Sequence, residues 1–99
     1  MLDPFHEWRE VQAAAEEARL DLIRTDLELC LTFATVAETS YSMGHLEHAE
    51  RNIANAEKGY SDMLRFFSKA NRLTPETEQE LRSKFRQLRE RLDGLQRRR

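Results

Sequence analysis

The chain has 99 residues, enough for one domain with a modest core, and this length excludes a second catalytic domain. Hydrophobic residues make up 39% of the sequence and charged residues 34%, which excludes a membrane span and a collagen-like chain. The one cysteine excludes an internal disulfide bond, and three glycines and two prolines leave few turns.

The net charge of −2 is unevenly distributed along the chain. Residues 82–99 hold eight Lys or Arg against two carboxylates, so this segment carries +6 and residues 1–81 carry −8. The N-terminus has neither a basic run nor an apolar segment, so we expect no signal peptide and a cytoplasmic location. Cys30 stands among leucines and is interpreted as a small buried hydrophobe.

The first predicted helix covers residues 4–41. It begins at Asp3-Pro4, an N-cap followed by proline, and no Gly or Pro interrupts it before Gly44. Its first half carries a thin apolar row at helical spacing, formed by Trp8, Val11, Ala15, Ala18 and Leu22. Its second half carries two rows, one of Leu22, Leu29, Phe33 and Val36, the other of Leu20, Ile23, Leu27, Cys30, Ala34, Ala37 and Tyr41. Because a helix that is apolar on two sides packs between neighbours, residues 20–41 are predicted to be the central element.

The second predicted helix covers residues 46–70, after a break at which Gly44 can adopt the left-handed conformation. Its apolar stripe has unbroken helical spacing and consists of Leu46, Ala49, Ile53, Ala56, Tyr60, Met63, Phe67 and Ala70. Gly59 costs a helix about 1 kcal/mol relative to Ala, which indicates close packing or a local bend. The seam between the first two helices is predicted to contain Leu22, Cys30, Phe33, Ala37, Ala49, Ile53, Ala56 and Tyr60.

The third predicted helix covers residues 75–95 and begins at Thr74-Pro75-Glu76; a basic tail, residues 96–99, follows it. Its apolar stripe is Leu81, Phe85, Leu88, Leu92 and Leu95. The positions beside this stripe are positively charged, so parallel self-pairing would bring like charges together. The stripe is therefore expected to pack on the acidic body of its own chain. The predicted fold is an all-α antiparallel three-helix bundle in a single domain, residues 1–99.

The turn between the first two helices carries a recurrent packing pattern. Gly44 lies in the turn, and Ala49, Ile53 and Ala56 supply a small, a large apolar and another small residue. In these positions residues 30–61 resemble one tetratricopeptide (TPR) repeat. Residues of the preceding helix fall at the tryptophan, leucine and small positions of the family; these are Phe33, Val36 and Ala37.

The chain departs from the TPR pattern at Ser40, where a tyrosine is usual, and at Ser61, where the closing proline would stand. A shift of 34 residues in either direction finds no second repeat. The matching residues are packing residues, so the resemblance implies a helical hairpin and, at family level, a protein-interaction scaffold.

Catalytic and metal-binding patterns are weak in this sequence. His45 and His48 have a spacing that could share a metal ion, but no zinc-protease motif or nearby cysteine supports such a site. No Glu-x-x-His pair, glycine-rich phosphate loop or recognisable nucleophile is found. We therefore expect no enzymatic activity, no cofactor and no metal ion.

Two surfaces could bind a partner. The second helix is too short to cover the first half of the first helix. Either the first helix bends near residue 18 and folds this half back, or the half overhangs and another molecule covers it. Because no Gly or Pro marks a bend there, we expect an overhang that forms a homodimer or binds another protein. The candidate interface residues are Trp8, Val11, Ala15 and Ala18. The alternative is a nucleic-acid or anionic-surface binder, although the near absence of interleaved aromatics makes nucleic acid a weaker hypothesis. The candidate basic residues are Arg82, Lys84, Arg86, Arg89, Arg91, Arg97, Arg98 and Arg99.

Overall fold

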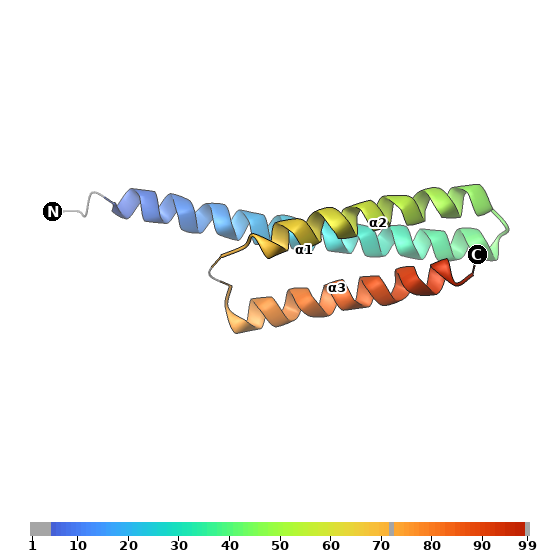
Figure 1. The fold of residues 1–99 in the computed structure, drawn as a ribbon. Coiled ribbons are helices and arrows are strands. Elements are labelled where there is room, and N and C mark those ends of the chain that lie inside the picture. Colours follow the sequence, from blue (N-terminus) through green and yellow to red (C-terminus); the bar gives the residue numbers. More distant parts are fainter. Residues whose placement is uncertain (1–4, 72, 99) are drawn as a thin grey trace.

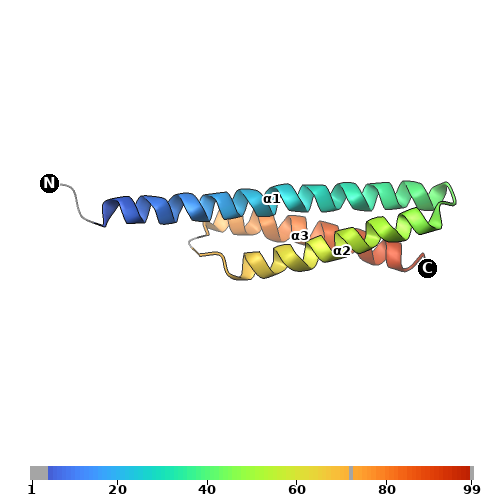
Figure 2. The same ribbon diagram turned by 90° about the horizontal axis from the view of Figure 1, so that it is seen from above.

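The computed structural model describes residues 5–71 and 73–98. It contains three helices: α1 (His6–Ser42), α2 (Leu46–Ser68) and α3 (Pro75–Gln96). The chain runs up α1, down α2 and up α3, and α1 packs against both other helices (Figures 1 and 2). No strand occurs in the described ranges, so the predicted all-α three-helix bundle is confirmed. The helix bounds differ from the expected ones only at the ends; α2, for example, ends at Ser68 rather than at residue 70.

The turn between α1 and α2 is set by Gly44, whose φ is +79°. The Gly44 N–H donates to the Tyr41 carbonyl at 3.1 Å, and the His45 N–H donates to the Ser40 carbonyl at 2.8 Å. This pair of bonds is a Schellman motif, which satisfies the carbonyls at the end of α1 and requires a left-handed residue. The predicted role of Gly44 is therefore confirmed.

The start of α3 also follows the sequence signals. The Thr74 hydroxyl accepts a hydrogen bond from the Thr77 N–H at 3.1 Å, and Pro75 occupies the first helical turn. Both features stabilise a helix N-terminus because they remove free backbone donors. The start predicted for the first helix, Asp3-Pro4, lies outside the described residues.

The core lies along the line where the three helices meet. Its fully enclosed side chains come from all three helices and include Ile23, Leu27, Ile53, Leu81, Leu88, Leu92 and Leu95. Ala49 and Ala56 are completely buried, as expected of small residues that let two helices approach. Partly buried aromatic residues complete the side of the core between α2 and α3: the rings of Tyr60 and Phe67 lie 5.8 and 5.4 Å from that of Phe85.

α1 and α2 approach each other closely at Gly59. A Cβ atom built on this residue would overlap the Sγ atom of Cys30. Gly59 is therefore needed because of close packing, one of the two explanations that the sequence offered. Cys30 is buried, as expected.

One expectation for α1 is wrong. The row of Leu22, Leu29, Phe33 and Val36 was expected to be enclosed by neighbours, but Leu22 and Leu29 are 46% and 49% exposed. Phe33 and Val36 are only half-buried, and Leu22 does not belong to the buried seam. The reason is geometric: α2 and α3 both lie against the Ile23–Leu27 side of α1, so a single row serves both contacts.

α1 is one continuous helix of 37 residues with no bend near residue 18. It extends past the end of the bundle, so that the molecule is long and narrow, 67 × 22 × 16 Å (Figures 1 and 2). The chain after α2 reaches back to Arg19, which donates to the Lys69 carbonyl at 3.3 Å, and to Glu16, which accepts from the Asn71 N–H at 3.1 Å. We call residues 6–15, which lie beyond these contacts, the overhang.

Candidate interaction surface

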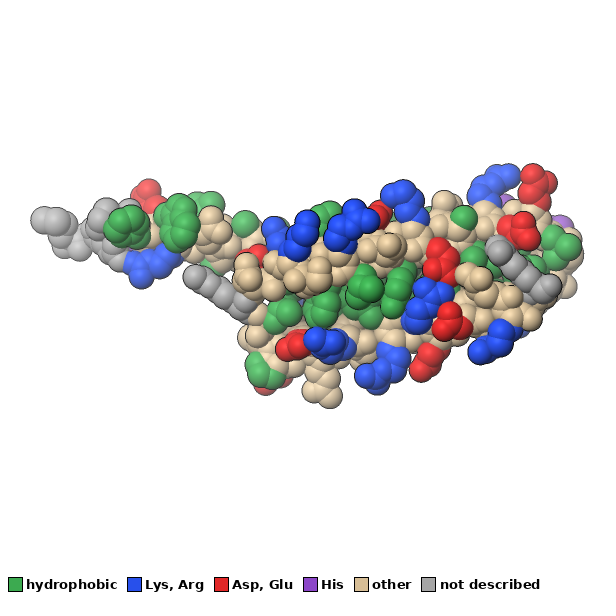
Figure 3. Space-filling view, viewed as in Figure 1, with side chains coloured by type: hydrophobic (Ala, Val, Ile, Leu, Met, Phe, Trp, Pro, Cys, Tyr) green, Lys and Arg blue, Asp and Glu red, His purple; other side chains and the backbone are tan. Residues whose placement is uncertain are grey.

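The overhang carries large apolar side chains that no other helix covers. Trp8 is 59% exposed and Val11 is 64% exposed, and Ala15 is also exposed. Figure 3 shows hydrophobic side chains gathered on this end of the molecule. Ala18, the fourth predicted interface residue, is exposed just inside the bundle. All four predicted interface residues are therefore accessible and follow one another at helical spacing.

The exposed apolar row does not stop where the bundle begins. Trp8, Ala15, Leu22, Leu29 and Val36 follow at intervals of seven residues, which keeps them on one side of α1. The positions between them on the same side are Val11, Ala18, Thr25, Thr32 and Thr39. We call these ten residues the outer stripe. Sequence reasoning divided it into an uncovered half and an enclosed half, although its seven-residue period is visible in the sequence.

Two of the three threonines of the outer stripe donate hydrogen bonds from their hydroxyl groups to backbone carbonyls of α1. The Thr32 hydroxyl donates to the Glu28 carbonyl at 3.1 Å, and the Thr39 hydroxyl donates to the Thr35 carbonyl at 3.2 Å. Because these two hydroxyls are satisfied within α1, covering them would leave no unpaired donor. Burying the stripe against another helix would therefore leave one threonine hydroxyl, that of Thr25, to be satisfied across the interface.

The charged groups beside the outer stripe are partly paired within the chain. On the side toward α3, Glu28 forms an ion pair with Lys84, and Asp21 pairs with Arg24 at 2.9 Å. Arg24 also binds Glu80 of α3 at 2.9 Å. The Arg24 guanidinium lowers the pKa of Glu80, chiefly by hydrogen bonding. The Glu28–Lys84 and Arg24–Glu80 pairs attach α3 to α1, and the pairs of Glu28 and Asp21 reduce the negative charge along that edge of the stripe.

Three of the eight residues of the predicted basic patch form such contacts with α1 or α2. Besides Lys84, Arg89 binds Glu57 of α2 at 2.6 Å, and Arg91 binds Glu38 of α1 at 2.9 Å. The Glu57 carboxylate raises the pKa of Arg89, chiefly by hydrogen bonding. Three of the predicted basic residues therefore hold α3 on the acidic body, which is the intramolecular arrangement expected from the charge asymmetry.

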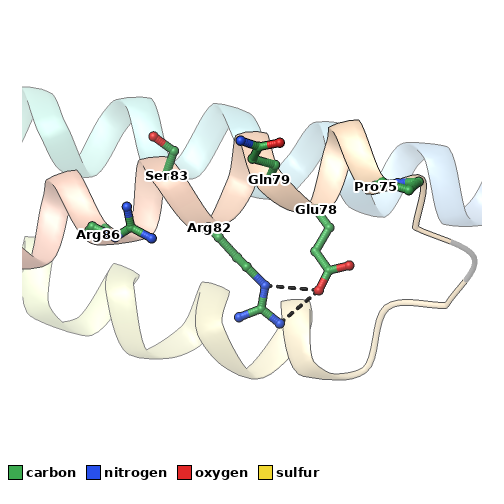
Figure 4. A pocket seen from close by; sticks show the side chains of 6 residues that line it. All are labelled: Pro75, Glu78, Gln79, Arg82, Ser83 and Arg86. Carbon is green, nitrogen blue, oxygen red and sulfur yellow. Dashed lines mark hydrogen bonds and ion pairs between the residues drawn. The ribbon is translucent and has the colours of Figure 1, made fainter.

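The remaining basic residues lie on the outer face of α3 and at its end. Arg82 and Arg86 line an open depression beside Pro75 (Figure 4), but Arg82 is bound by Glu78 at 2.9 Å. Arg82 also lies over the Phe67 ring, 5.6 Å from its centre. Among the described residues, no ion pair involves the other predicted basic side chains, Arg86, Arg97 and Arg98. Arg99 lies outside the described residues.

His45 and His48, at the turn between α1 and α2, belong to no cluster of candidate metal ligands in the described part of the chain. His48 Nδ1 lies 3.0 Å from the Ser40 hydroxyl, and residues 5–71 and 73–98 hold no group of three His, Cys, Asp or Glu suited to a metal ion. Burial raises the pKa of the Cys30 thiol, which favours its protonated form.

Comparison with protein-family models, with curated proteins and with solved structures found no match to this chain. Within the described part of the chain, no helix combines the length and apolar character that crossing a membrane requires.

Proposed function

We propose that this protein is a non-enzymatic protein–protein interaction or assembly module and that it forms a homodimer. The observation that supports this most directly is the overhang, where Trp8 and Val11 remain more than half exposed on a helix with no neighbour. Exposed apolar surface of this kind on a soluble chain marks an interaction site. A large aromatic anchor such as Trp8 is also the residue type that contributes most to protein interfaces.

The hairpin of α1 and α2 supports the same class of function. Its positive-φ Gly44 and its buried Ala49 and Ala56 stand at the positions that resemble a TPR repeat. In this proposal the hairpin is a TPR-like scaffold, which holds α1 rigid while its outer side stays available. Rigid presentation favours binding because less conformational entropy is lost on association.

Polyanion binding through residues 82–99 is the alternative. The ion pairs of Lys84, Arg89 and Arg91 weigh against it, because a phosphate would have to displace a carboxylate from each of them. Binding to a polyanion at low and at moderate salt distinguishes the two functions. Phosphate contacts would give an affinity that falls steeply as the salt concentration rises.

The interaction function is tested by the double variant Trp8→Ala, Val11→Glu. We expect wild-type protein at high micromolar concentration to be dimeric by light scattering and the variant to be monomeric. A matched control is Leu46→Glu, because Leu46 is also exposed and apolar but lies at the start of α2. The control should stay dimeric. A wild-type protein that is monomeric under these conditions would contradict the homodimer.

A further inference from the structure

The outer stripe has the length and period of a coiled-coil seam. From Trp8 to Thr39 it measures about 47 Å at 1.5 Å per residue. It consists of two series of residues, one starting at Trp8 and the other at Val11, and each series repeats every seven residues. Its first half, residues 8–22, lies on the overhang and on the part of α1 that follows it. Its second half, residues 25–39, lies on the bundle. Both halves carry exposed apolar side chains, and they lie on one continuous line of one helix.

The midpoint of the outer stripe lies between Ile23 and Arg24. A two-fold axis placed there pairs each half of the stripe with the other half of a second copy running in the opposite direction. Leu22 then lies opposite Thr25 of the second copy, Ala18 opposite Leu29, and Trp8 opposite Thr39. Trp8, Leu22 and Leu29 each face a smaller side chain, which is the size match that interdigitating helices require, and Val11 faces Val36.

Charges on the α2 side of the stripe agree with this register. The antiparallel arrangement brings Arg19 of one copy to the level of Asp26 of the other, and symmetry forms this pair twice. On the opposite side the nearest groups are Asp21 and Glu28, which would repel each other if unpaired. They are paired with Arg24 and Lys84 within each copy, so the repulsion is reduced.

Phe66 supplies independent support for the position of the axis. Ser40 lies beside His48 and Cys30 beside Gly59, and this antiparallel register places Phe66 of α2 at the level of Ile23. Phe66 is 42% exposed, although it is large and apolar. At the level of the axis, the two copies of Phe66 would cover each other.

The exposed area is also what a dimer of this kind requires. A compact monomer of this mass, 11.7 kDa, would expose about 5,900 Å². The chain exposes 6965 Å². A seam about 47 Å long and one helix width across covers roughly 500 Å² on each copy, which reaches the lower limit for a specific interface of about 1,000 Å² in total.

We infer that the whole outer stripe of α1, and not the overhang alone, is the interface with an antiparallel second copy, in which each overhang lies on the bundle of its partner. This inference rests on the proposed homodimer and adds its geometry. It differs from contact between the overhangs alone because Leu29, on the bundle, would then be part of the interface.

The first experiment compares Leu29→Glu with Leu64→Glu. Leu64 has similar exposure, 42%, but lies on α2 outside the stripe. Leu29→Glu should weaken dimerisation by roughly a hundredfold or more, since each dimer would bury the new carboxylate twice. Leu64→Glu should leave the dimer affinity unchanged. Circular dichroism checks that both variants are folded; a folded Leu29→Glu variant with wild-type affinity would overturn the inference.

The second experiment uses oxidative cross-linking in a Cys30→Ala background, which removes the native thiol. Val11→Cys mixed with Val36→Cys should give a cross-linked heterodimer, and neither variant should cross-link to itself. Phe66→Cys should cross-link to itself across the axis. Self-cross-linking of Val11→Cys and of Val36→Cys would indicate parallel pairing, which overturns the antiparallel register but leaves the proposed function intact. A monomeric wild type would overturn both.

Discussion

Gly59 and Cys30 show how one residue pair sets the distance between α1 and α2. Glycine is unfavourable within a helix, yet here its missing side chain leaves the space that the Cys30 Sγ atom fills. The pair therefore acts as a unit: the sulfur atom can be accommodated only if position 59 has no Cβ. This dependence gives the close packing of the hairpin a direct experimental test.

Gly59→Ala should destabilise the protein by about 1–3 kcal/mol, because overpacking outweighs the gain in helix propensity. Adding Cys30→Ala should recover part of this loss, since it removes the overlapping atom. Urea unfolding of both single variants and the double variant measures the coupling between the two sites. If Gly59→Ala is as stable as the wild type, the two helices are farther apart than described.

Substitution of Tyr41, unlike that of Gly59, is not expected to destabilise the protein. The Tyr41 hydroxyl oxygen is buried and has no hydrogen-bond partner among the described residues. A buried polar group without a partner is destabilising, so Tyr41→Phe should leave the free energy of unfolding unchanged or raise it by up to about 1 kcal/mol. A loss of stability in urea unfolding would mean that this hydroxyl has a partner in solution.

Glu80 gives the protein an acid-sensitive contact. Its pKa is lowered in the folded state by the hydrogen bonds from Arg24, so the contact contributes its full stability above the unfolded pKa, about 4.3. This contribution is lost as the pH falls through the lower, folded pKa. Thermal midpoints measured between pH 6 and pH 3 should therefore decline less for Glu80→Gln than for the wild type. Glu50→Gln, an exposed site on α2, controls for the lost charge.

At the scale of elements, α3 is held by an apolar stripe and by ion pairs at its edges. Leu81, Leu88 and Leu92 are completely buried in the core. The ion pairs from α3 reach both other helices through Lys84, Arg89 and Arg91. Burial accounts for most of the attachment energy, because exposed ion pairs contribute only about 0–1 kcal/mol each.

Salt should therefore reduce the stability of the bundle only modestly. Raising the salt concentration from low to moderate screens the exposed pairs and should cost about 1 kcal/mol in total, which lowers the thermal midpoint by roughly 4–8 °C. The double variant Lys84→Gln, Arg91→Gln should show a smaller salt effect. A thermal midpoint that is flat or rises over this range would contradict the electrostatic contribution to docking.

At the scale of the whole molecule, the overhang and the bundle are separable in their energetic roles. The buried residues of α1 begin at Ile23, so residues 6–15 contribute almost nothing to the core. Their apolar side chains lower the free energy only when another molecule covers them. Stability and assembly are therefore expected to depend on different parts of the same helix.

Deletion of residues 1–15 should leave a cooperatively unfolding helical bundle that no longer dimerises. The full-length chain should also have a thermal midpoint that rises with protein concentration, whereas the shortened chain should not show this dependence. Circular dichroism melts at two concentrations, together with light scattering, measure both effects. A shortened chain that fails to fold would show that the overhang belongs to the bundle.

The sequence was sufficient to predict the three helices, because each has a distinct local cause. The stripes of α2 and α3 keep helical spacing, and the chain is interrupted where Gly44 and Thr74-Pro75 stand. The buried leucines of α3 and the small residues Ala49 and Ala56 were identified for the same reason. All of these depend on local chemistry or on a single periodic pattern.

Only the tertiary structure decided which apolar row of α1 is buried. The Leu22–Leu29 row and the Ile23–Leu27 row are both hydrophobic, and the spacing of residues within one helix cannot rank them. In a bundle of three helices each helix meets both neighbours along one side, so one row fills the core and the other stays exposed. Hydrophobicity determines what a helix can bury, but the number and placement of its neighbours determine what it does bury.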